Sequence, residues 1–472
     1  MIVRSLEWVA STLAAADDGL LVKNGVGDRG ENGWAGAVVD SRADCSGRLF
    51  FALRGENTDG HQYVTNAFSA GSAAAIVDDE SVCPELESAR IPYILVEDSA
   101  RALRELARAY RAQLDVRVIA ITGSAGKTTT KEYVRRVLNT KYRVFANPGN
   151  FNSMIGVPVT ILETDGDNEY LVSEVGANQP GEVGFLAEML QPEIGVITNI
   201  GDAHVGMFGS VENIAHAKAE LLDHVASHGC AVLPSDDEWF EFLAGRTAAR
   251  AVTFGRSESA DFVLSNVGPR QDAGGMSLMV NDEGLDVGSV GEYNALNACA
   301  AFAVGDVCGV EHSRIREALA GVAPMPGRGR VRRAGGVTVI DESYNASPAS
   351  MSASVKMLGS MEASRRTAVL GDMKELGAYS DDRHRAIGER LAEAAIDAVF
   401  WLGDEAAPVR EGYEHAGGKS EFKAHKTLDG LTTEVVAHVR AGDAVLVKAS
   451  RSVGLDGLVA VLLERLESNT EN

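Results

Sequence analysis

Residues 121–130 read ITGSAGKTTT, and this stretch decides the fold of the segment around it. It overlaps the end of an apolar run at residues 116–122, VRVIAIT, and leads into residues 128–139, whose apolar side chains recur at helical spacing. In a turn between a strand and a helix, glycines such as Gly123 and Gly126 let backbone N–H groups close around phosphate oxygens at the helix N-terminus. The pattern therefore predicts a nucleotide-phosphate loop.

The side chains of this loop suit the same ligand. Lys127 would reach the outer phosphates, and the Thr128 hydroxyl would bind Mg²⁺. The common phosphate loop has a glycine five places before its second glycine, where Ile121 stands here, so this is the shorter T-G-x-x-G-K-T form. A glycine-rich turn without a ligand is the alternative, and the flanking strand and helix argue against it. The predicted loop residues are Gly123, Ser124, Ala125, Gly126, Lys127, Thr128 and Thr129.

Outward from the loop, apolar runs alternate with helical stretches. EYLVSEV at residues 169–175 and EIGVITNI at 193–200 are as continuously apolar as strands in a sheet covered on both faces. Strands that alternate with helices predict a mostly parallel, doubly wound sheet. Further on, a Gly-rich stretch at 268–291 predicts hairpins, and residues 294–304 predict an Ala-rich helix.

The 472 residues suggest about three domains at roughly 150 residues each. A small α/β domain is expected at residues 1–98, followed by a helix, with Ser99 as its cap, that leads into a central domain at 99–325. The Pro- and Gly-rich stretch APMPGRGR marks the next boundary, and residues 326–472 form a Rossmann-like α/β domain. Strands are predicted in the first domain at 48–53, 73–77 and 93–96, and in the third at 337–341, 366–372, 398–404 and 444–450.

Composition excludes several classes of protein. The 44 Lys and Arg against 67 Asp and Glu give a net charge of −23, which disfavours extended nucleic-acid binding but not one nucleotide in a local pocket. The five cysteines are scattered and form no C-x-x-C pair, so neither a disulfide framework nor a zinc site is expected. The N-terminal stretch suits an amphipathic helix better than a signal peptide, and no apolar run reaches about 18 residues. We expect a soluble, cytoplasmic protein without membrane insertion, and a monomer.

The loop T-G-S-A-G-K-T-T resembles the ATP loop of the Mur ligase family, whose members join an amino acid or peptide to a carboxylate through an acyl phosphate. Other segments match the family in the right order over almost the whole chain. They are NFNSMIGVP (150–158), SEVGAN (173–178), TNIGDAHVGMFGS (198–210), AKAEL (217–221), MPGRGRV (325–331), DESYNASPASM (341–351), LGDMKELG (370–377) and VKASR (447–451). Y-N-A-x-P, L-G-D-M-x-E-L-G and V-K-x-S-R are most similar to the branch that adds D-alanyl-D-alanine to UDP-N-acetylmuramoyl-tripeptide in peptidoglycan precursor synthesis.

Several alternatives stay open. The branch that adds lysine or diaminopimelate usually has a D-N-P-R segment in its last domain, and none occurs here. A Mur-like ligase of another pathway is a further alternative, although DSR at residues 40–42 and DGH at 59–61 resemble a UDP-binding module. A P-loop kinase, a regulatory NTPase or a non-catalytic nucleotide-binding scaffold would leave Arg328, Asp341 and the third domain without a clear role.

The resemblance also implies a catalytic set of Lys127, Glu174, His204 and Lys218. From the residues alone, Glu174 is a carboxylate at the end of a buried strand, His204 is a loop histidine and Lys218 lies on a helix surface. By resemblance, Glu174 joins Thr128 in binding Mg²⁺ beside the phosphates, His204 binds a second Mg²⁺, and Lys218 helps hold Mg²⁺. Lys218 would be N6-carboxylated, because CO₂ added to the neutral amine replaces a cation with an anion that can help hold Mg²⁺.

The remaining candidates belong to the substrates. YNALNA at residues 293–298 resembles the family's H-N-x-x-N-A helix start, with Tyr293 in place of His. By resemblance, ATP is bound through Asn294, Asn297, Arg328 and Asp341, and the UDP substrate through Ser41, Arg42, Asp59, His61, Asn150 and Asn152. The dipeptide is expected to contact Asn345, Lys448, Ser450 and Arg451, with Arg451 pairing with its carboxylate through two N–H bonds.

Overall fold

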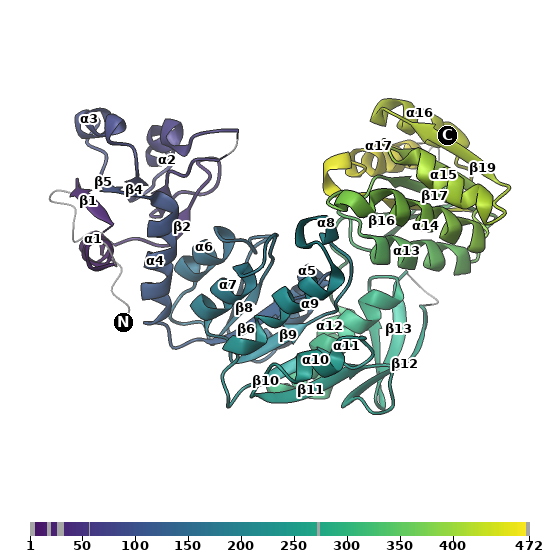
Figure 1. The fold of residues 1–472 in the computed structure, drawn as a ribbon, viewed down its shortest axis with the longest axis horizontal. Coiled ribbons are helices and arrows are strands. Elements are labelled where there is room, and N and C mark those ends of the chain that lie inside the picture. The colour runs from purple at the N-terminus through teal and green to yellow at the C-terminus, as the bar shows by residue number, and fades with distance from the viewer. Residues whose placement is uncertain (1–4, 17–19, 26–32, 56, 271–273, 469–472) are drawn as a thin grey trace.

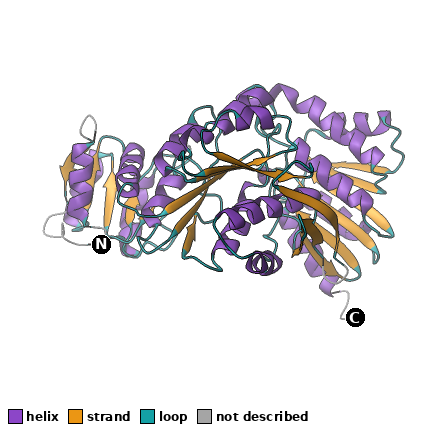
Figure 2. Cartoon of the chain, turned by 90° about the horizontal axis from the view of Figure 1, so that it is seen from below, coloured by secondary structure: helices purple, strands orange, loops and turns teal. Residues whose placement is uncertain are grey.

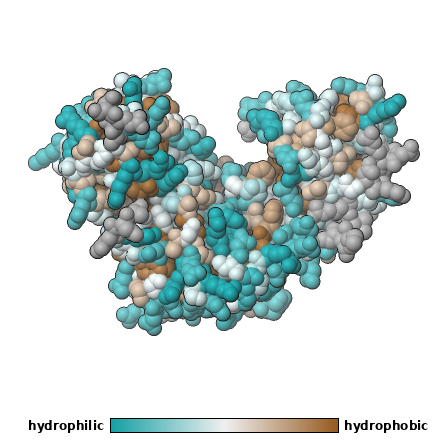
Figure 3. Space-filling view, turned by 180° about the vertical axis from the view of Figure 1, so that it is seen from behind, coloured by the Kyte–Doolittle hydropathy of each residue, from teal (hydrophilic) through white to brown (hydrophobic). Residues whose placement is uncertain are grey.

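The computed structural model describes residues 5–16, 20–25, 33–55, 57–270 and 274–468. These residues form three α/β lobes in chain order, and Figure 1 shows the first and third lobes on either side of the central one. Figure 3 shows the same open space between the two outer lobes from behind. Helices lie on both faces of the sheets (Figure 2). The expected three-lobed α/β architecture is confirmed.

The first lobe contains a five-stranded sheet in the order β1-β5-β4-β3-β2. Its strands are β1 (Leu21–Asn24), β2 (Ala37–Val38), β3 (Leu49–Phe51), β4 (Ala74–Val77) and β5 (Tyr93–Val96), parallel except for β1. Its helices are α1 (Leu6–Ala15), α2 (Val64–Ser69) and α3 (Cys83–Ser88). The three predicted strands are confirmed as β3, β4 and β5. The helix α1 buries Leu6, Val9 and Leu13, as an amphipathic helix does.

Helix α4 (Ser99–Arg111) connects the first lobe to the central one. Its cap is Asp98 rather than the predicted Ser99, because the Asp98 carboxylate accepts a hydrogen bond from the Arg101 N–H. The helix packs against α6 and α7 of the central lobe and against α1 of the first. The buried Tyr110 donates a hydrogen bond to the Thr164 carbonyl at 3.1 Å, which ties the connection to the central lobe.

The central lobe is built on a nine-stranded sheet in the order β14-β13-β12-β11-β10-β9-β6-β8-β7. Its strands are β6 (Arg117–Thr122), β7 (Val144–Ala146), β8 (Tyr170–Glu174), β9 (Ile194–Ile197), β10 (Cys230–Pro234), β11 (Arg250–Gly255), β12 (Phe262–Pro269), β13 (Met276–Val280) and β14 (Glu283–Val287). The strands β6 to β12 are parallel, and β13 and β14 add the predicted hairpins. The doubly wound sheet is thus confirmed.

The register of this sheet places the loops that follow three strands together. Ile121 of β6 pairs with Glu174 of β8, and Thr122 pairs with Ile197 of β9. Ligands bind at this carboxyl edge in open α/β sheets. The helices of the lobe are α5 (Lys127–Leu138), α6 (Gly156–Glu163), α7 (Glu182–Leu190), α8 (Val205–Phe208), α9 (Val211–Ala219), α10 (Phe240–Ala244), α11 (Glu292–Val307) and α12 (His312–Ala320).

The C-terminal lobe has a six-stranded sheet in the order β15-β16-β20-β17-β18-β19. The strands are β15 (Arg330–Ala334), β16 (Val337–Glu342), β17 (Arg365–Gly371), β18 (Ala398–Leu402), β19 (Glu421–His425) and β20 (Asp443–Lys448). The four predicted strands are confirmed, whereas β15 and β19 were missed because they are edge strands with polar sequences. The helices are α13 (Pro348–Ser360), α14 (Ser380–Glu393), α15 (Ala406–His415), α16 (Leu428–His438) and α17 (Asp456–Ser468).

Candidate active site

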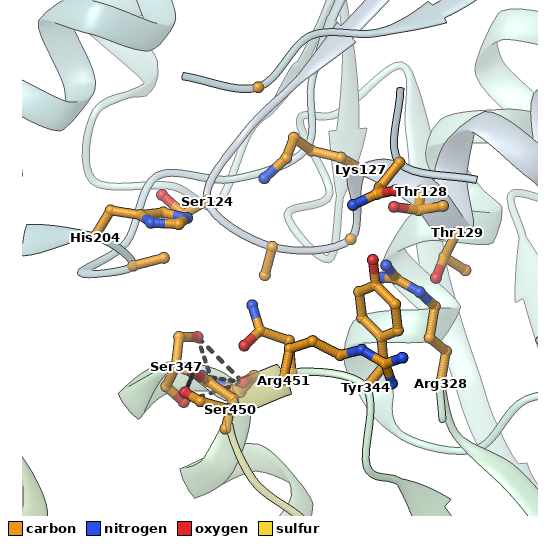
Figure 4. A pocket seen from close by; sticks show the side chains of 18 of the residues that line it. Ser124, Lys127, Thr128, Thr129, His204, Arg328, Tyr344, Ser347, Ser450 and Arg451 are labelled. Carbon is orange, nitrogen blue, oxygen red and sulfur yellow. Dashed lines mark hydrogen bonds between the residues drawn. The ribbon is translucent and has the colours of Figure 1, made fainter. Parts of the chain in front are cut away.

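A cavity of about 560 Å³ lies between the central and C-terminal lobes. One wall carries the phosphate loop, the end of β8 and His204, and the opposite wall carries residues from the C-terminal lobe. Figure 4 shows Lys127 and Thr128 facing Tyr344 and Arg451 across this space. Segments from residue 124 to residue 452 therefore meet at one site.

The two loop glycines are required by backbone shape and by crowding. Gly123 and Gly126 have φ values of +144° and +81°, where side chains are rarely accommodated. A Cβ atom at Gly123 would run into the Thr198 hydroxyl, and one at Gly126 would run into the Asn297 side chain. Gly126 is also the N-cap of α5, so the N–H groups of the first helical turn face the cavity.

The segment after β9 braces the phosphate loop. The Ala125 N–H donates to Asn199 Oδ1 at 2.9 Å, and the Thr198 hydroxyl donates to the Ala125 carbonyl at 2.6 Å. The Ser124 hydroxyl donates to the Gly201 carbonyl at 3.0 Å. Sequence reasoning gave Thr198 and Asn199 no role, although both lie in the matched segment TNIGD. They hold the loop in shape before a phosphate arrives.

Lys127 lies at the mouth of the loop. Its Nζ donates to the Gly123 carbonyl at 2.8 Å, and its side chain points into the cavity (Figure 4). Burial lowers the pKa of Lys127, while the negative charge of Glu174 acts in the opposite direction. A phosphate would supply the negative charge that stabilises the ammonium here.

Glu174 offers a free carboxylate oxygen beside the loop. The residue is 2% exposed, and its Oε1 accepts a hydrogen bond from Asn152 Nδ2 at 2.6 Å. Its Oε2 has no hydrogen-bond partner among the described residues. This orphaned oxygen and the hydroxyl of Thr128 line the same cavity, and hard oxygen donors are what Mg²⁺ prefers. The residues therefore fit one Mg²⁺.

His204 and Lys218 fit a Mg²⁺ less well than Thr128 and Glu174 do, because only His204 lines the cavity. His204 lines the cavity, has a φ of +65°, and places Nδ1 against the Glu375 carboxylate of the C-terminal lobe. Burial lowers the pKa of His204, although Glu375 raises it. Lys218 on α9 does not line the cavity, and burial followed by the charge of Lys127 lowers its pKa to about 7. The described residues hold no cluster of three His, Cys, Asp or Glu side chains that could bind a metal.

The residues expected around the adenosine lie at the start of α11 and at the lobe boundary. Asn294 Nδ2 donates to the Val290 carbonyl at 2.7 Å, and both Asn294 and Asn297 line the cavity. The Arg328 guanidinium lies 3.9 Å from the centroid of the Tyr344 ring and also lines the cavity. Asp341 does not line it, because its carboxylate accepts hydrogen bonds from the Gly327 N–H at 2.9 Å and from Ser343.

The four dipeptide candidates all line the C-terminal wall; they are Asn345, Lys448, Ser450 and Arg451. Lys448 Nζ lies 3.1 Å from Glu342 Oε2 and donates to the Asn345 carbonyl at 3.0 Å. The Arg451 guanidinium lies 5.5 Å from the Tyr344 ring centroid. Sequence reasoning missed Glu342 and Tyr344, as well as Lys374 and Glu375 on the same wall, although all four lie in matched motifs.

The structure does not bring the first-lobe candidates to this cavity. Ser41, Arg42, Asp59 and His61 do not line it, and the Arg42 side chain is 88% exposed and bonded to Asp40. His61 is buried, contacts Asp59 Oδ1 at 2.6 Å through Nδ1 and accepts the Asp78 N–H at 3.1 Å through Nε2. Asp59 and His61 thus build a turn.

Two other residues predicted to bind the UDP substrate, Asn150 and Asn152, are not in the first lobe. They lie in the central lobe and line the cavity beside Glu174. They are therefore placed near the phosphate loop.

The chain is similar to known proteins over nearly its whole length. Residues 36–111 match the model for the Mur ligase family, catalytic domain, residues 121–305 that for the Mur ligase middle domain, and residues 327–451 that for the Mur ligase, glutamate ligase domain. UDP-N-acetylmuramoyl-tripeptide–D-alanyl-D-alanine ligase of Bacillus subtilis is 34% identical over 91% of this chain and 93% of its own length.

Solved structures agree with this similarity. A crystal structure of MurF from Acinetobacter baumannii superposes with a TM-score of 0.82 at 29% identity, covering 96% of this chain and 98% of that one. The crystal structure of MurF ligase from Thermotoga maritima in complex with ADP has a TM-score of 0.78 at 30% identity, covering 92% and 98%. No helix in the described part of this chain is long and apolar enough to span a membrane.

Proposed function

Because the chain belongs to the Mur ligase family, we propose that it joins D-alanyl-D-alanine to UDP-N-acetylmuramoyl-tripeptide and that ATP is converted to ADP and phosphate in the process. This is the reaction named for relatives that cover nine-tenths of the chain. The observation that carries it within the molecule is the shared cavity, where a phosphate loop faces a wall with two lysines and two arginines. The product is a precursor of peptidoglycan.

In the first step, the terminal carboxylate of the tripeptide attacks the γ-phosphorus of ATP. A carboxylate oxygen–phosphorus bond forms, the bond to the β–γ bridging oxygen breaks, and ADP leaves with the electron pair. The N–H groups at the start of α5 and the Lys127 ammonium face the phosphates and stabilise the charge that develops there. Asn297 and Asn294 line the adenosine side of the cavity.

Thr128 and Glu174 would hold a Mg²⁺, which when bound neutralises phosphate charge. His204 and an N6-carboxylated Lys218 would hold a second. The low pKa of Lys218, about 7, leaves a large neutral fraction of its amine near neutral pH, and CO₂ adds only to the neutral form. The loss of a buried cation beside Lys127 would also remove an unfavourable repulsion.

In the second step, the amine of the dipeptide attacks the acyl carbon of the acyl phosphate. The new C–N bond replaces the C–O bond to phosphate, and the phosphate leaves with the proton that the amine loses. Water would hydrolyse the acyl phosphate, so the C-terminal domain, residues 326–472, has to cover the cavity during the reaction. Arg328 and Arg451 line the cavity, where Arg328 would contact the phosphates and Arg451 would pair with the dipeptide carboxylate.

The first domain, residues 1–98, would hold the UDP end of the substrate through Ser41 and Arg42. Asp59 and His61 would act on this site by shaping the turn rather than by direct contact. Asn150 and Asn152 would then meet the peptide end of the substrate near Glu174. In this arrangement one long substrate connects the first domain to the central cavity.

The function is tested by incubating the purified chain with UDP-N-acetylmuramoyl-tripeptide, ATP, Mg²⁺ and D-alanyl-D-alanine and measuring phosphate. Release is expected only when all four are present, and the K127A variant is the matched control. Release that does not need the dipeptide would indicate an NTPase instead. Release that requires lysine or diaminopimelate, with the dipeptide precursor as acceptor, would assign the chain to the preceding step.

A further inference from the structure

Two buried carboxylate oxygens, on glutamates that line the cavity, have no hydrogen-bond partner in the described part of the chain. They are Oε2 of Glu174 on the central wall and Oε1 of Glu342 on the C-terminal wall. The oxygen of Glu174 fits a Mg²⁺ beside Thr128. The oxygen of Glu342 has no use in the reaction described above.

Glu342 is held firmly from one side. It is the last residue of β16 and pairs in register with Lys448 of β20, so the two side chains lie next to each other. Its Oε2 lies 3.1 Å from Lys448 Nζ and accepts a hydrogen bond from the Ser354 hydroxyl of α13. The side chain is 3% exposed. These contacts fix the orientation of the carboxylate and leave Oε1 without a hydrogen-bond donor among the described residues.

A buried, charged oxygen without a donor is unfavourable, so a ligand that brings a donor would complete the site. A metal ion fits poorly, because Lys448 lies against the same carboxylate and Glu342 belongs to no group of three His, Cys, Asp or Glu side chains among the described residues. Of the reactive groups that meet in the cavity, the phosphates and the tripeptide carboxylate are anionic. The amino group of the incoming dipeptide is the one that carries a positive charge.

We propose that Glu342 Oε1 binds the amino group of the incoming dipeptide and holds it on the C-terminal wall, facing the acyl phosphate. This inference rests on the proposed function. Arg451 on the same wall supplies the opposite charge for the dipeptide carboxylate, so the wall matches both ends of a zwitterion. Figure 4 shows that Arg451 and Tyr344 lie across the cavity from Lys127, where the phosphoryl group is activated.

The test compares wild type with Glu342→Gln, which keeps the shape of the side chain and removes its charge. The KM for D-alanyl-D-alanine is expected to rise about 10- to 100-fold, as for the loss of a hydrogen bond to a charged group. The KM values for ATP and for the tripeptide substrate should stay within about twofold. Without dipeptide, hydroxylamine should still trap the acyl phosphate as a hydroxamate at the wild-type rate.

Two further measurements separate binding of the amino group from a structural role. N-acetyl-D-alanyl-D-alanine has no ammonium group and is expected to inhibit wild type and E342Q equally. Ser354→Ala removes a donor from Oε2 but keeps the charge and Oε1, so its dipeptide KM should rise much less than that of E342Q. If E342Q does not fold, Glu342→Asp is the alternative, because it keeps the charge but withdraws it by one methylene group. The KM of E342D for the dipeptide should rise, while its KM values for the other substrates should not.

The inference is overturned if E342Q and E342D leave the dipeptide KM unchanged in an active enzyme. It is also overturned if the KM for the tripeptide rises equally, since Glu342 would then bind an amino group of that substrate, or if hydroxamate trapping is lost, since Glu342 would then be structural. A wild-type chain that releases no dipeptide-dependent phosphate overturns the proposed function itself. The two failures are therefore distinguishable.

Discussion

Hydrogen bonds between neutral side chains and the backbone hold the central wall of the cavity, whereas charged side chains that pair with one another hold the C-terminal wall. On the central wall, Asn199 accepts a loop N–H and Gly126 leaves room for Asn297. On the C-terminal wall, Lys448 pairs with Glu342, and Arg451 lies 3.3 Å from Asp456. The first wall is shaped before a ligand binds. On the second wall, Lys448 stays paired with Glu342, whereas Arg451 has to exchange Asp456 for a substrate carboxylate.

The largest expected effect is on the central wall. Lys127→Ala should lower the turnover number about 1,000-fold, because the variant loses a charge aimed at the transferred phosphoryl group. The side chain donates only to the Gly123 carbonyl among the described residues, so the fold should be kept. Phosphate release measures the loss, and an unchanged melting temperature shows that the wall is intact. Near-normal turnover would remove the phosphate loop from the mechanism.

Variants of Lys218 test whether carboxylation of this lysine contributes to the reaction. Burial lowers its pKa to about 7, so the fraction of neutral amine increases as pH rises through that value, and carboxylation with it. With ¹³C-labelled bicarbonate, a carbamate carbon signal should appear above about pH 7 and weaken below it. Lys218→Arg cannot form the carbamate and should lose the signal and about 100-fold in turnover. A signal that persists in this variant would place the carbamate on another lysine.

A substitution of Lys131 tests how the segment of residues 147–152 is held against the phosphate loop. This lysine is completely buried and donates to the carbonyls of Asn147 and Gly149 at 2.6 and 3.0 Å. Lys131→Met keeps the volume but leaves both carbonyls without this donor. We expect a lower melting temperature and about a tenfold loss of turnover, because Asn152 would no longer hold Glu174 in place. Unchanged melting and turnover would show that the segment is held by other contacts.

The smallest effect is expected where the central lobe contacts the C-terminal lobe. The Tyr379 hydroxyl donates to the Gly209 carbonyl at 2.8 Å across the lobe boundary. Tyr379→Phe should change the KM for ATP by no more than about threefold, the scale of one exposed neutral hydrogen bond. Steady-state kinetics with ATP as the varied substrate measure it. A change of tenfold or more would mean that this contact controls how the lobes close.

The same contrast explains what the sequence allowed us to predict. The phosphate loop is local, so its glycines, Lys127 and Thr128 could be placed from ten consecutive residues. The strands that flank it were identified for the same reason. The bracing by Thr198 and Asn199 could not be predicted, because it depends on the pairing of β6 with β9 about 75 residues further along the chain.

The C-terminal wall was harder to predict. Glu342 and Lys448 meet only because β16 and β20 are neighbours in the sheet, and nothing in their local sequences indicates that pairing. His61 was expected to contact a substrate, but its two ring nitrogens are used within the first lobe by Asp59 and Asp78. On the C-terminal wall, the matched motifs identified segments that contribute residues to the cavity. Only the three-dimensional contacts distinguish the residues that face the cavity from those that support it.

Labelling the terminal carboxylate of the tripeptide substrate with ¹⁸O tests most directly whether phosphate is transferred to that carboxylate. If the carboxylate attacks ATP and the dipeptide amine then displaces phosphate, one ¹⁸O atom must leave with each phosphate released. Mass spectrometry of the phosphate should therefore show a single label per turnover. Phosphate that carries no label from the carboxylate would mean that water attacks ATP, and it would contradict the account of this cavity as a ligase site.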